Sequence, residues 1–564
     1  MKIFTKHSCI LSLLFFFTLN IPAQEFRWAK RAGLWAYDYG YGISADDSGN
    51  VYVTGKYEMD AIFDDSTVTC EGNHDIFITK YGPGGNLIWV NTAGGLWGDY
   101  AHAIACDGAG NSYITGEIEA TSIFHGSNIT LNAWGKNDIF VAKYNSAGVP
   151  QWAHRGGGKI SDKGQSIAIS QDAVYVTGYF RDTALFNNDG AFQVISAGEK
   201  DAFFAKYDLM GNLIWLKRGG GIGDDEGSGI TVGEDGFIYV AGHFDGEGNF
   251  DGVAVNSNGG RDAYLAKFNP SGNLIWIKNE GGTGRETGMA VKAAKDGRIY
   301  MTGGFSGKAK FGSTSISSNG DYDIFVSCFT NNGGVVWAKR AGGTLSDVGL
   351  GIAADDSSIY ITGHYGGSTD FEGQSITGKD SAEIFIAKYS YNSEFKWVMK
   401  ADGQKDAKYE GQHEEAGRSI WIDTKKFVIV TGSYRTDASL GPFDLQGWSN
   451  TDIFVAKIKQ DESDESDESE EIDNTGILEN KPDNHFKVYP IPSDEVINIA
   501  YLGTEHLNVN IKVQSLEGKT IVEKVYKSSG SSNEVILLNN IARGIYFLQI
   551  QTEQEQFVQK IIIK

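Results

Sequence analysis

Short segments in which apolar and polar residues alternate fill most of this chain, separated by turns rich in glycine, asparagine and aspartate. The stretch after the first tryptophan shows the pattern clearly. It contains four such segments, at residues 42–46, 51–57, 75–81 and 87–91. Alternation with a period of two predicts half-buried β-strands, and no amphipathic helix of useful length is visible. We therefore predict four strands in this stretch.

The same pattern recurs seven times along the chain. Each copy carries a Tyr-x-Thr-Gly motif or a close variant of it, then an acid-x-aromatic motif, then a tryptophan. The tryptophans follow one another at intervals of 60 to 63 residues, at Trp28, Trp89, Trp152, Trp215, Trp276, Trp337 and Trp397. A repeat of this length indicates a solenoid or a propeller.

The phase of the repeat decides between the two. The pattern begins with a lone fourth strand at Trp28 and ends with a third strand at residues 452–457, which no repeat tryptophan follows. An open solenoid would leave both as unpaired edges, which proteins avoid. We therefore predict an all-β fold, with residues 24–459 forming a seven-bladed β-propeller that its N-terminal strand closes.

The repeats resemble the bacterial β-propeller repeat family called SBBP. The third copy shows the likeness, with Trp152, Gly156-Gly157, Tyr175-Val176-Thr177-Gly178 and Asp201-Ala202-Phe203. The resemblance covers about 430 residues and rests on sevenfold recurrence. It implies an exported or surface protein of the S-layer-like grouping, and it implies no catalytic residues.

The N-terminus has the order of a secretory signal peptide. Lys2 and Lys6 precede an apolar run at residues 9–19, and small residues follow at 21–24. The run is too short to span a bilayer, and no later stretch reaches the length of a membrane helix. We predict a signal peptide at residues 1–23 and a soluble, exported mature chain without a transmembrane segment.

The composition changes after the last repeat. Residues 460–485 are rich in serine, aspartate and glutamate and cannot bury a core, so they predict a solvated acidic linker. Calcium binding by this run is the one cofactor that we consider, although it lacks a glycine-turned loop. From residue 486 onwards, six or seven short strands follow in under 80 residues, which predicts a small β-sandwich.

This C-terminal region, residues 486–564, resembles the sorting domain of the Bacteroidetes type IX secretion system. The matching marks are Pro490-x-Pro492, Leu516-x-Gly518-Lys519, Gly544-x-Tyr546 and the basic end at 560–564. Ile491 stands where the family usually has asparagine. The resemblance implies that the type IX machinery is a partner, that the chain crosses the outer membrane, and that it is then released or attached at the cell surface.

Composition and charge exclude several other functions. The net charge is −23 and no cluster of Lys and Arg is present, which argues against nucleic-acid binding. Outside the leader there are three scattered cysteines, too few for a disulfide framework or a C-x-x-C metal site. No G-x-S-x-G, H-E-x-x-H or phosphate-loop motif occurs, so we assign no catalytic residue and predict no enzyme.

One recurring acid is a candidate for chemistry. Every loop from the repeat tryptophan to the next first strand carries one: Asp38, Asp99, Asp162, Asp225, Glu286, Asp347 and Glu415. These loops lead into the innermost strands, so the carboxyls are expected at one mouth of the channel, where they could bind a cation. The alternative is pairing between blades with arginine or backbone amides, because seven unpaired carboxylates would repel.

Variable loops carry a second candidate. The two long connections of each copy open on one face of a propeller, and such loops often carry function. Four tryptophans outside the repeat column lie there: Trp35, Trp97, Trp134 and Trp448. Exposed indoles stack on sugar rings, which suggests a glycan site, whereas the plain alternative is loop packing. His243 and His364 follow the motif glycine in two copies and are interpreted as structural, because Gly304 intervenes.

Two functions remain open. The first is a surface binding or adhesion module that recognises a glycan or a protein with the long-loop face. The second is a propeller-type polysaccharide hydrolase or lyase, which needs two carboxyls in different environments. Near-identical acids in every copy favour the first.

Overall fold

The computed structural model describes residues 24–460, apart from 187–191, 379–381, 404–414, 436 and 448–449. It also describes residues 486–563, apart from 490–495, 502–507, 516–518, 528–531, 538–540, 542–543 and 553–555. The expected signal peptide and nearly all of the acidic linker lie outside these residues. The chain separates into two compact units, Met1–Asp461 and Glu462–Lys564. Every described element is a β-strand, so the all-β prediction is confirmed. The described residues therefore include no helix long and apolar enough to span a membrane.

The first repeat forms a four-stranded antiparallel sheet, as its alternation predicted. From the inside outwards the strands are β2 (Tyr39–Ala45), β3 (Val51–Tyr57), β6 (Asp75–Tyr81) and β7 (Leu87–Gly94). A small hairpin of β4 (Asp60–Phe63) and β5 (Ser66–Thr69), which the sequence did not predict, connects the second strand to the third.

Among the described residues, five further sheets repeat this order. The second contains β8 (Tyr100–Cys106), β9 (Ser112–Phe124), β10 (Ile129–Tyr144) and β11 (Pro150–Gly157), and the third contains β12 (Lys163–Ile169), β13 (Ala173–Phe180), β16 (Asp201–Asp208) and β17 (Leu213–Gly221). The fourth contains β18 (Glu226–Val232), β19 (Ile238–Phe250), β20 (Val253–Phe268) and β21 (Leu274–Gly282). The fifth contains β22 (Glu286–Ala293), β23 (Ile299–Phe305), β26 (Asp323–Phe329) and β27 (Val335–Ala341). The sixth contains β28 (Val348–Ala354), β29 (Ser358–Tyr365), β32 (Glu383–Ser390) and β33 (Phe395–Lys400).

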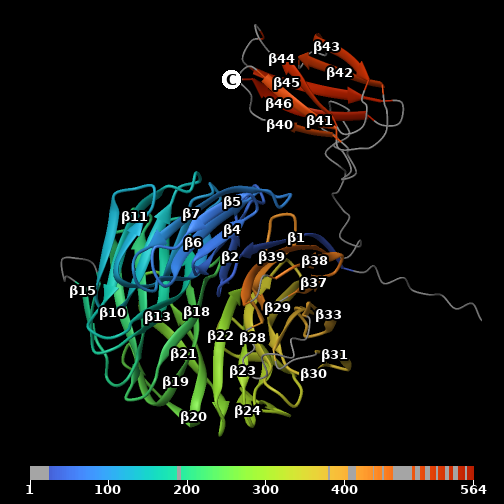
Figure 1. Ribbon diagram of the computed structural model, residues 1–564. Coiled ribbons are helices and arrows are strands. Elements are labelled where there is room, and N and C mark those ends of the chain that lie inside the picture. Colours follow the sequence, from blue (N-terminus) through green and yellow to red (C-terminus); the bar gives the residue numbers. More distant parts are fainter. Residues whose placement is uncertain are drawn as a thin grey trace, which may run out of the picture. The chain divides into compact units, whose positions relative to one another are not determined.

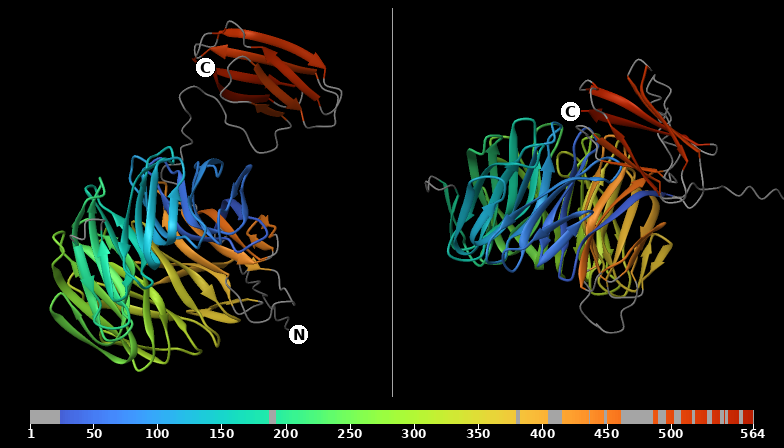
Figure 2. Two further views of the ribbon diagram at one scale, coloured as in Figure 1. Left: turned by 60° about the vertical axis from the view of Figure 1, so that its left-hand side comes forward. Right: turned by 45° about the horizontal axis from the view of Figure 1, so that its top comes forward.

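The last sheet combines both ends of the repeat region. It contains β35 (Ala416–Ile422), β36 (Val428–Arg435), β39 (Thr451–Lys459) and, as its outer strand, β1 (Glu25–Gly33). β1 pairs antiparallel with β39, with Trp28 opposite Lys457 and Arg31 opposite Phe454. This is the pairing that the repeat phase predicted. The sheets follow one another around a central axis in chain order, and the orange strands of the last repeat lie beside the blue strands of the first (Figures 1 and 2).

Neighbouring sheets are joined through the small hairpins. The end of β1 pairs with β4, placing Ala32 opposite Phe63, and β7 likewise pairs with the extended end of β9. The same arrangement recurs at β11 with β14 (Thr183–Phe186), at β17 with β19, and at β21 with β24 (Lys308–Phe311). Five outer strands therefore take backbone hydrogen bonds from the next repeat, which ties these sheets together beyond side-chain packing.

The repeat tryptophans make a second link between sheets. The indole N–H of Trp28 donates to the carbonyl of Pro83 at 2.9 Å, and Trp152 donates to Leu209 at 3.2 Å. Each acceptor lies in the turn before the outer strand of the next repeat. Six of the seven repeat tryptophans donate in this way, whereas the indole N–H of Trp397 has no partner among the described residues. A side chain that links successive repeats is expected to recur from copy to copy, as these tryptophans do.

The motif glycine packs against its own sheet. A Cβ at Gly55 would collide with the carbonyl oxygen of Tyr39 in the paired strand β2, and Gly116 stands in the same relation to Tyr100. The register of β2 and β3 shifts at this point, which marks a β-bulge. This glycine therefore admits the bulged innermost strand of its own sheet.

The C-terminal unit consists of two antiparallel sheets. One contains β40 (Phe486–Tyr489), β41 (Val496–Tyr501) and β44 (Ser532–Leu537). The other contains β43 (Thr520–Lys527), β42 (Asn508–Ser515), β45 (Gly544–Gln551) and β46 (Gln556–Ile563). Buried aliphatic side chains from both sheets form its core: Ile499, Val509, Ile511, Val513, Leu548 and Ile550.

Candidate functional site

Two of the tryptophans singled out from the sequence lie exposed in equivalent loops of adjacent sheets. Trp35 is 56% exposed in the loop before β2, and Trp97 is 51% exposed in the loop before β8. A hydrogen bond within the first loop fixes its backbone, because the carboxylate of Asp38 accepts the N–H of Leu34 at 3.0 Å. The backbone N–H of Asp99 likewise donates to the carbonyl of His74 at 2.9 Å. Both indoles therefore stand on loops whose backbones are anchored.

The other two tryptophans differ. Trp134, in β10, is 48% exposed, and the guanidinium of Arg155 lies 3.4 Å from the centre of its ring. Arg155 is buried and forms a 2.6 Å ion pair with Asp138, so this stack is part of the packing. Only the other face of the Trp134 ring is available to a ligand. Trp448 lies outside the described residues.

The seven loop acids are buried at the junctions between sheets, and none lines the central cavity. Asp162 shows the arrangement, since it accepts the backbone N–H of Gly158 at 2.7 Å and that of Arg181 at 2.8 Å. These amides belong to the loop before the innermost strand and to the end of the second strand. The expected ring at the channel mouth is therefore absent among the described residues. A carboxyl that caps two backbone segments turns back into the junction instead of facing the channel.

Six of the seven loop acids, Glu415 aside, also face a second buried acid. At one junction, Asp138 Oδ1 and Asp162 Oδ2 lie 2.8 and 2.9 Å from the point where a Cβ on Gly157 would sit. Glu286 and Asp262 share the space beside Gly281 in the same way. Burial raises the pKa of Asp162 to about 7, and the negative charge of Asp138 adds to the effect. These paired carboxyls are therefore structural groups that favour holding a proton.

A cluster of aromatic and charged residues lies where the first two inner strands begin. The rings of Tyr39 and Tyr41 stack at 5.7 Å, and those of Tyr100 and His102 at 6.0 Å. His102 Nε2 and Glu117 Oε1 are 3.0 Å apart. Burial lowers the pKa of His102 to about 4, with the charge of Lys163 acting in the same direction. The imidazole is therefore neutral at pH 7 and could act as a base.

Cations complete this aromatic cluster. The guanidinium of Arg418 lies 5.3 and 5.2 Å from the ring centres of Tyr39 and Tyr41. The ammonium of Lys56 lies 5.0 Å from the centre of the Tyr39 ring and pairs with Glu58 at 3.0 Å. Our sequence reasoning missed this cluster. The available signal was the chemical variety of the column that follows the motif glycine, which begins with Lys56 and Glu117.

The described residues provide no metal centre. They contain no group of three or more His, Cys, Asp or Glu side chains that could hold an ion. His243 is buried, and neither of its ring nitrogens has a hydrogen-bond partner among the described residues. Burial lowers the pKa of His364 to about 4, aided by the charge of Arg418. The two histidines belong to different sheets, β19 and β29, and each titrates in its own surroundings.

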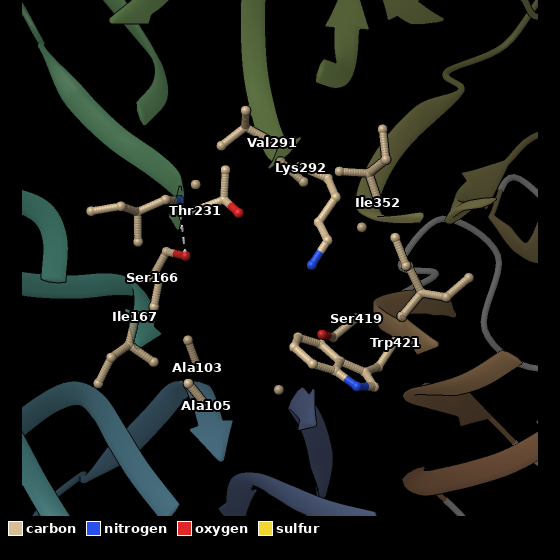
Figure 3. A pocket seen from close by; sticks show the side chains of 18 of the residues that line it. Ala103, Ala105, Ser166, Ile167, Thr231, Val291, Lys292, Ile352, Ser419 and Trp421 are labelled. Carbon is tan, nitrogen blue, oxygen red and sulfur yellow. Dashed lines mark hydrogen bonds between the residues drawn. The ribbon is translucent and has the colours of Figure 1, made fainter. Parts of the chain in front are cut away.

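The innermost strands of all seven sheets line a central cavity of about 270 Å³. Most of its lining is aliphatic, with Ile167, Val291 and Ile352 among the side chains in view (Figure 3). Lys292 and Trp421 extend into it, and the ammonium lies 4.9 Å from the centre of the indole. Burial lowers the pKa of Lys292.

Two segments of the chain match family models. Residues 487–564 match the secretion system C-terminal sorting domain, and residues 27–56 match a β-propeller repeat. Both resemblances recognised in the sequence are thereby confirmed. The sorting domain indicates export to the cell surface or the extracellular space, with the type IX secretion system as a partner.

Two curated proteins are similar to this chain. An uncharacterized WD repeat-containing protein of Acanthamoeba polyphaga mimivirus is 22% identical over 515 residues, covering 72% of this chain and 36% of that protein. The regulatory protein FlaEY of Caulobacter vibrioides is 24% identical over 261 residues, covering 41% of this chain and 26% of that protein. The chain thus spans about a third of the length of these relatives or less.

Solved structures offer weaker likenesses. A puromycin hydrolase aligns with a TM-score of 0.30 and 8% identity, covering 72% of this chain and 58% of that one. A glycoside hydrolase family 43 arabinoxylan arabinofuranohydrolase from Bacillus subtilis aligns at 0.24 and 11%, covering 71% and 94%. Latent PorU from Porphyromonas gingivalis aligns at 0.14 and 8%, covering 76% and 31%. Scores this low have no bearing on activity.

Proposed function

We propose that the exported propeller is a surface binding module that recognises a glycan with the long-loop face of its first two repeats. The observation that carries the proposal is the exposure of Trp35 and Trp97 on anchored loops of adjacent sheets. Leaving a tryptophan ring in water forgoes about 2–3 kcal/mol of burial free energy, so two such rings in equivalent loops favour a partner.

Preorganisation supports the same conclusion. Ordering a side chain and its loop on binding costs about 0.5–1.5 kcal/mol per group, and an anchored loop avoids much of that cost. The partly exposed rings of Tyr41 and Tyr100 lie near the starts of the strands that follow these loops. Aromatic faces next to charged groups are typical of sugar recognition, in which rings stack and hydroxyls form hydrogen bonds.

A polysaccharide hydrolase or lyase is the alternative function. The loop acids do not support it, because they are buried and bonded to backbone amides. The His102–Glu117 pair is the feature that favours it, since a neutral imidazole held by a carboxylate can take up a proton. Release of reducing ends from acidic and neutral polysaccharides, compared between the native protein and His102→Gln, tests this alternative directly.

Binding is tested with Trp35→Ala and Trp97→Ala on a glycan array, with the melting temperature measured in parallel. Each change should weaken binding at least tenfold and leave the melting temperature within about 2 °C, because an exposed ring contributes little to packing. Met210→Ala is the matched control, because Met210 is 80% exposed in the turn between β16 and β17. Unchanged glycan binding in both tryptophan variants would contradict the proposal.

A further inference from the structure

The central cavity contains a chemical asymmetry that a sevenfold scaffold does not require. In each innermost strand, one residue pairs with the first residue of the Tyr-x-Thr-Gly motif or of its variant. Five copies have a small side chain at this position: Ser44, Ala105, Ala168, Thr231 and Ala353. The fifth and seventh copies instead have Lys292 and Trp421. These two are among the largest side chains of the cavity lining.

Lys292 and Trp421 come from β22 and β35, with β28 of the sixth repeat between them. Ala353 of β28 is small, which leaves space for the two long side chains to meet. The ammonium lies 4.9 Å from the centre of the indole, as Figure 3 shows. Among the described residues, no hydrogen bond or ion pair reaches Lys292 Nζ, and none reaches the indole N–H of Trp421.

Two serine hydroxyls in view are already hydrogen-bonded to the backbone. The hydroxyl of Ser166 accepts the backbone N–H of Ile230 at 3.2 Å, and that of Ser419 accepts the N–H of Ile43 at 3.3 Å. Burial alone accounts for the lowered pKa of Lys292, so no described acid compensates its charge. Because no described acid lies against this ammonium, an anion that enters the cavity can pair with it without displacing a protein partner.

We propose that this cavity binds a small carboxylate-bearing ligand of monosaccharide size, such as a hexuronate. The carboxylate pairs with the ammonium of Lys292, and the indole of Trp421 stacks on the ring or donates its N–H. The volume of about 270 Å³ corresponds to roughly nine water molecules. It is enough for one sugar ring and too small for an oligosaccharide. The small side chains of Ala105 and Ala168 leave the opposite wall open to the ligand.

A carboxylate fits this site better than a phosphate does. Phosphate sites in proteins usually offer several backbone N–H groups or an arginine fork, which together match three oxygens. Arg418 also lines this cavity, but its guanidinium stacks on Tyr41 and its Nε donates to the hydroxyl of Ser433 at 3.4 Å. Beside Lys292 there remain one ammonium and one indole N–H, which match the two oxygens of a carboxylate. This site lies in the central cavity and is distinct from the exposed indoles of Trp35 and Trp97. A negative binding result for one site therefore leaves the proposal for the other site unaffected.

The test is calorimetric titration of the full chain at pH 7 with glucuronate and galacturonate, and with glucose and inorganic phosphate for comparison. At least one uronate should bind, and glucose should bind at least tenfold more weakly. Lys292→Met keeps the length of the side chain without the charge and should abolish uronate binding. Lys295→Met is the control, because Lys295 is 68% exposed and pairs with Asp356 at 2.8 Å in a nearby turn.

The melting temperature separates binding from folding. Lys292→Met should melt at the same temperature as the native protein or higher, because it removes an uncompensated charge. If this variant fails to fold, Lys292→Gln provides the same comparison. The proposal is overturned if neither uronate binds, if glucose binds equally well, or if the Lys292 variants retain binding. Phosphate binding tighter than that of both uronates would also overturn it.

Discussion

The paired carboxyls at the junctions predict an unusual dependence of stability on pH. At the junction of the first two sheets, burial raises the pKa of Asp99 to about 7, and the neighbouring Asp75 raises it further. Asp99 accepts the hydroxyl of Ser122 at 2.6 Å and the N–H of Glu119 at 3.0 Å. Asparagine at position 99 would keep an acceptor for both bonds and could donate to the buried, unpartnered Oδ1 of Asp75. The informative perturbation is therefore Asp99→Asn.

The magnitude follows from linkage. The folded protein holds the proton of Asp99 up to about pH 7, whereas the unfolded chain releases it near 3.8. Between these values the folded state binds more protons, so the free energy of unfolding falls as the pH rises and levels off above pH 7. Three pH units at about 1.4 kcal/mol each give an upper limit of about 4 kcal/mol for this site. Asp99→Asn removes that loss, so it should match the native protein near pH 4 and exceed its stability at pH 8.

Denaturant unfolding of the full chain between pH 4 and pH 8 measures this difference. All twelve tryptophans precede residue 449, so their fluorescence reports on the propeller alone. Asp46→Asn is the matched control, because the pKa shift of Asp46 has the opposite sign to that of Asp99. Burial acts to raise the pKa of Asp46, but hydrogen bonds from Asn50 and Tyr52 outweigh it and hold that pKa below its usual value. If the stability of Asp99→Asn follows that of the native protein at every pH, the reasoning that folded Asp99 keeps its proton up to about pH 7 is wrong.

Three further predictions concern the scaffold and export. Gly116→Ala should lower the free energy of unfolding by more than about 3 kcal/mol, because its Cβ would collide with the carbonyl of Tyr100, whereas Gly84→Ala should be almost neutral in the same denaturant assay. Deletion of residues 24–33 should remove the outer strand of the last sheet, lower the melting temperature and cause aggregation on size-exclusion chromatography; a monomer of unchanged stability would contradict the pairing of β1 with β39. Truncation after Asn484 should leave a folded propeller in the periplasm, as cell fractionation would show, and normal surface delivery would refute the role of the sorting domain.

The candidate site was less predictable than the scaffold. Comparison of the seven copies picked out Trp35 and Trp97, because rings that serve only the fold should recur, as the Trp28 column does. The same comparison did not show that Arg155 covers one face of Trp134. That stack joins residues from two strands, and its geometry depends on the buried carboxylate of Asp138, whose partner the sequence leaves open.

The sequence by itself determined the architecture of this protein. Alternation with a period of two, seven copies of one motif and a repeat that starts in its fourth strand are local properties, and each can be read without knowing any contact between repeats. Tertiary structure alone decided where the acids and cations lie. Whether a carboxyl such as Asp162 faces the channel or the junction depends on which backbone amides the neighbouring segments bring within about 3 Å. Likewise, Lys292 and Trp421 are 129 residues apart in the chain, and only the arrangement of the sheets around one axis places them in the same cavity.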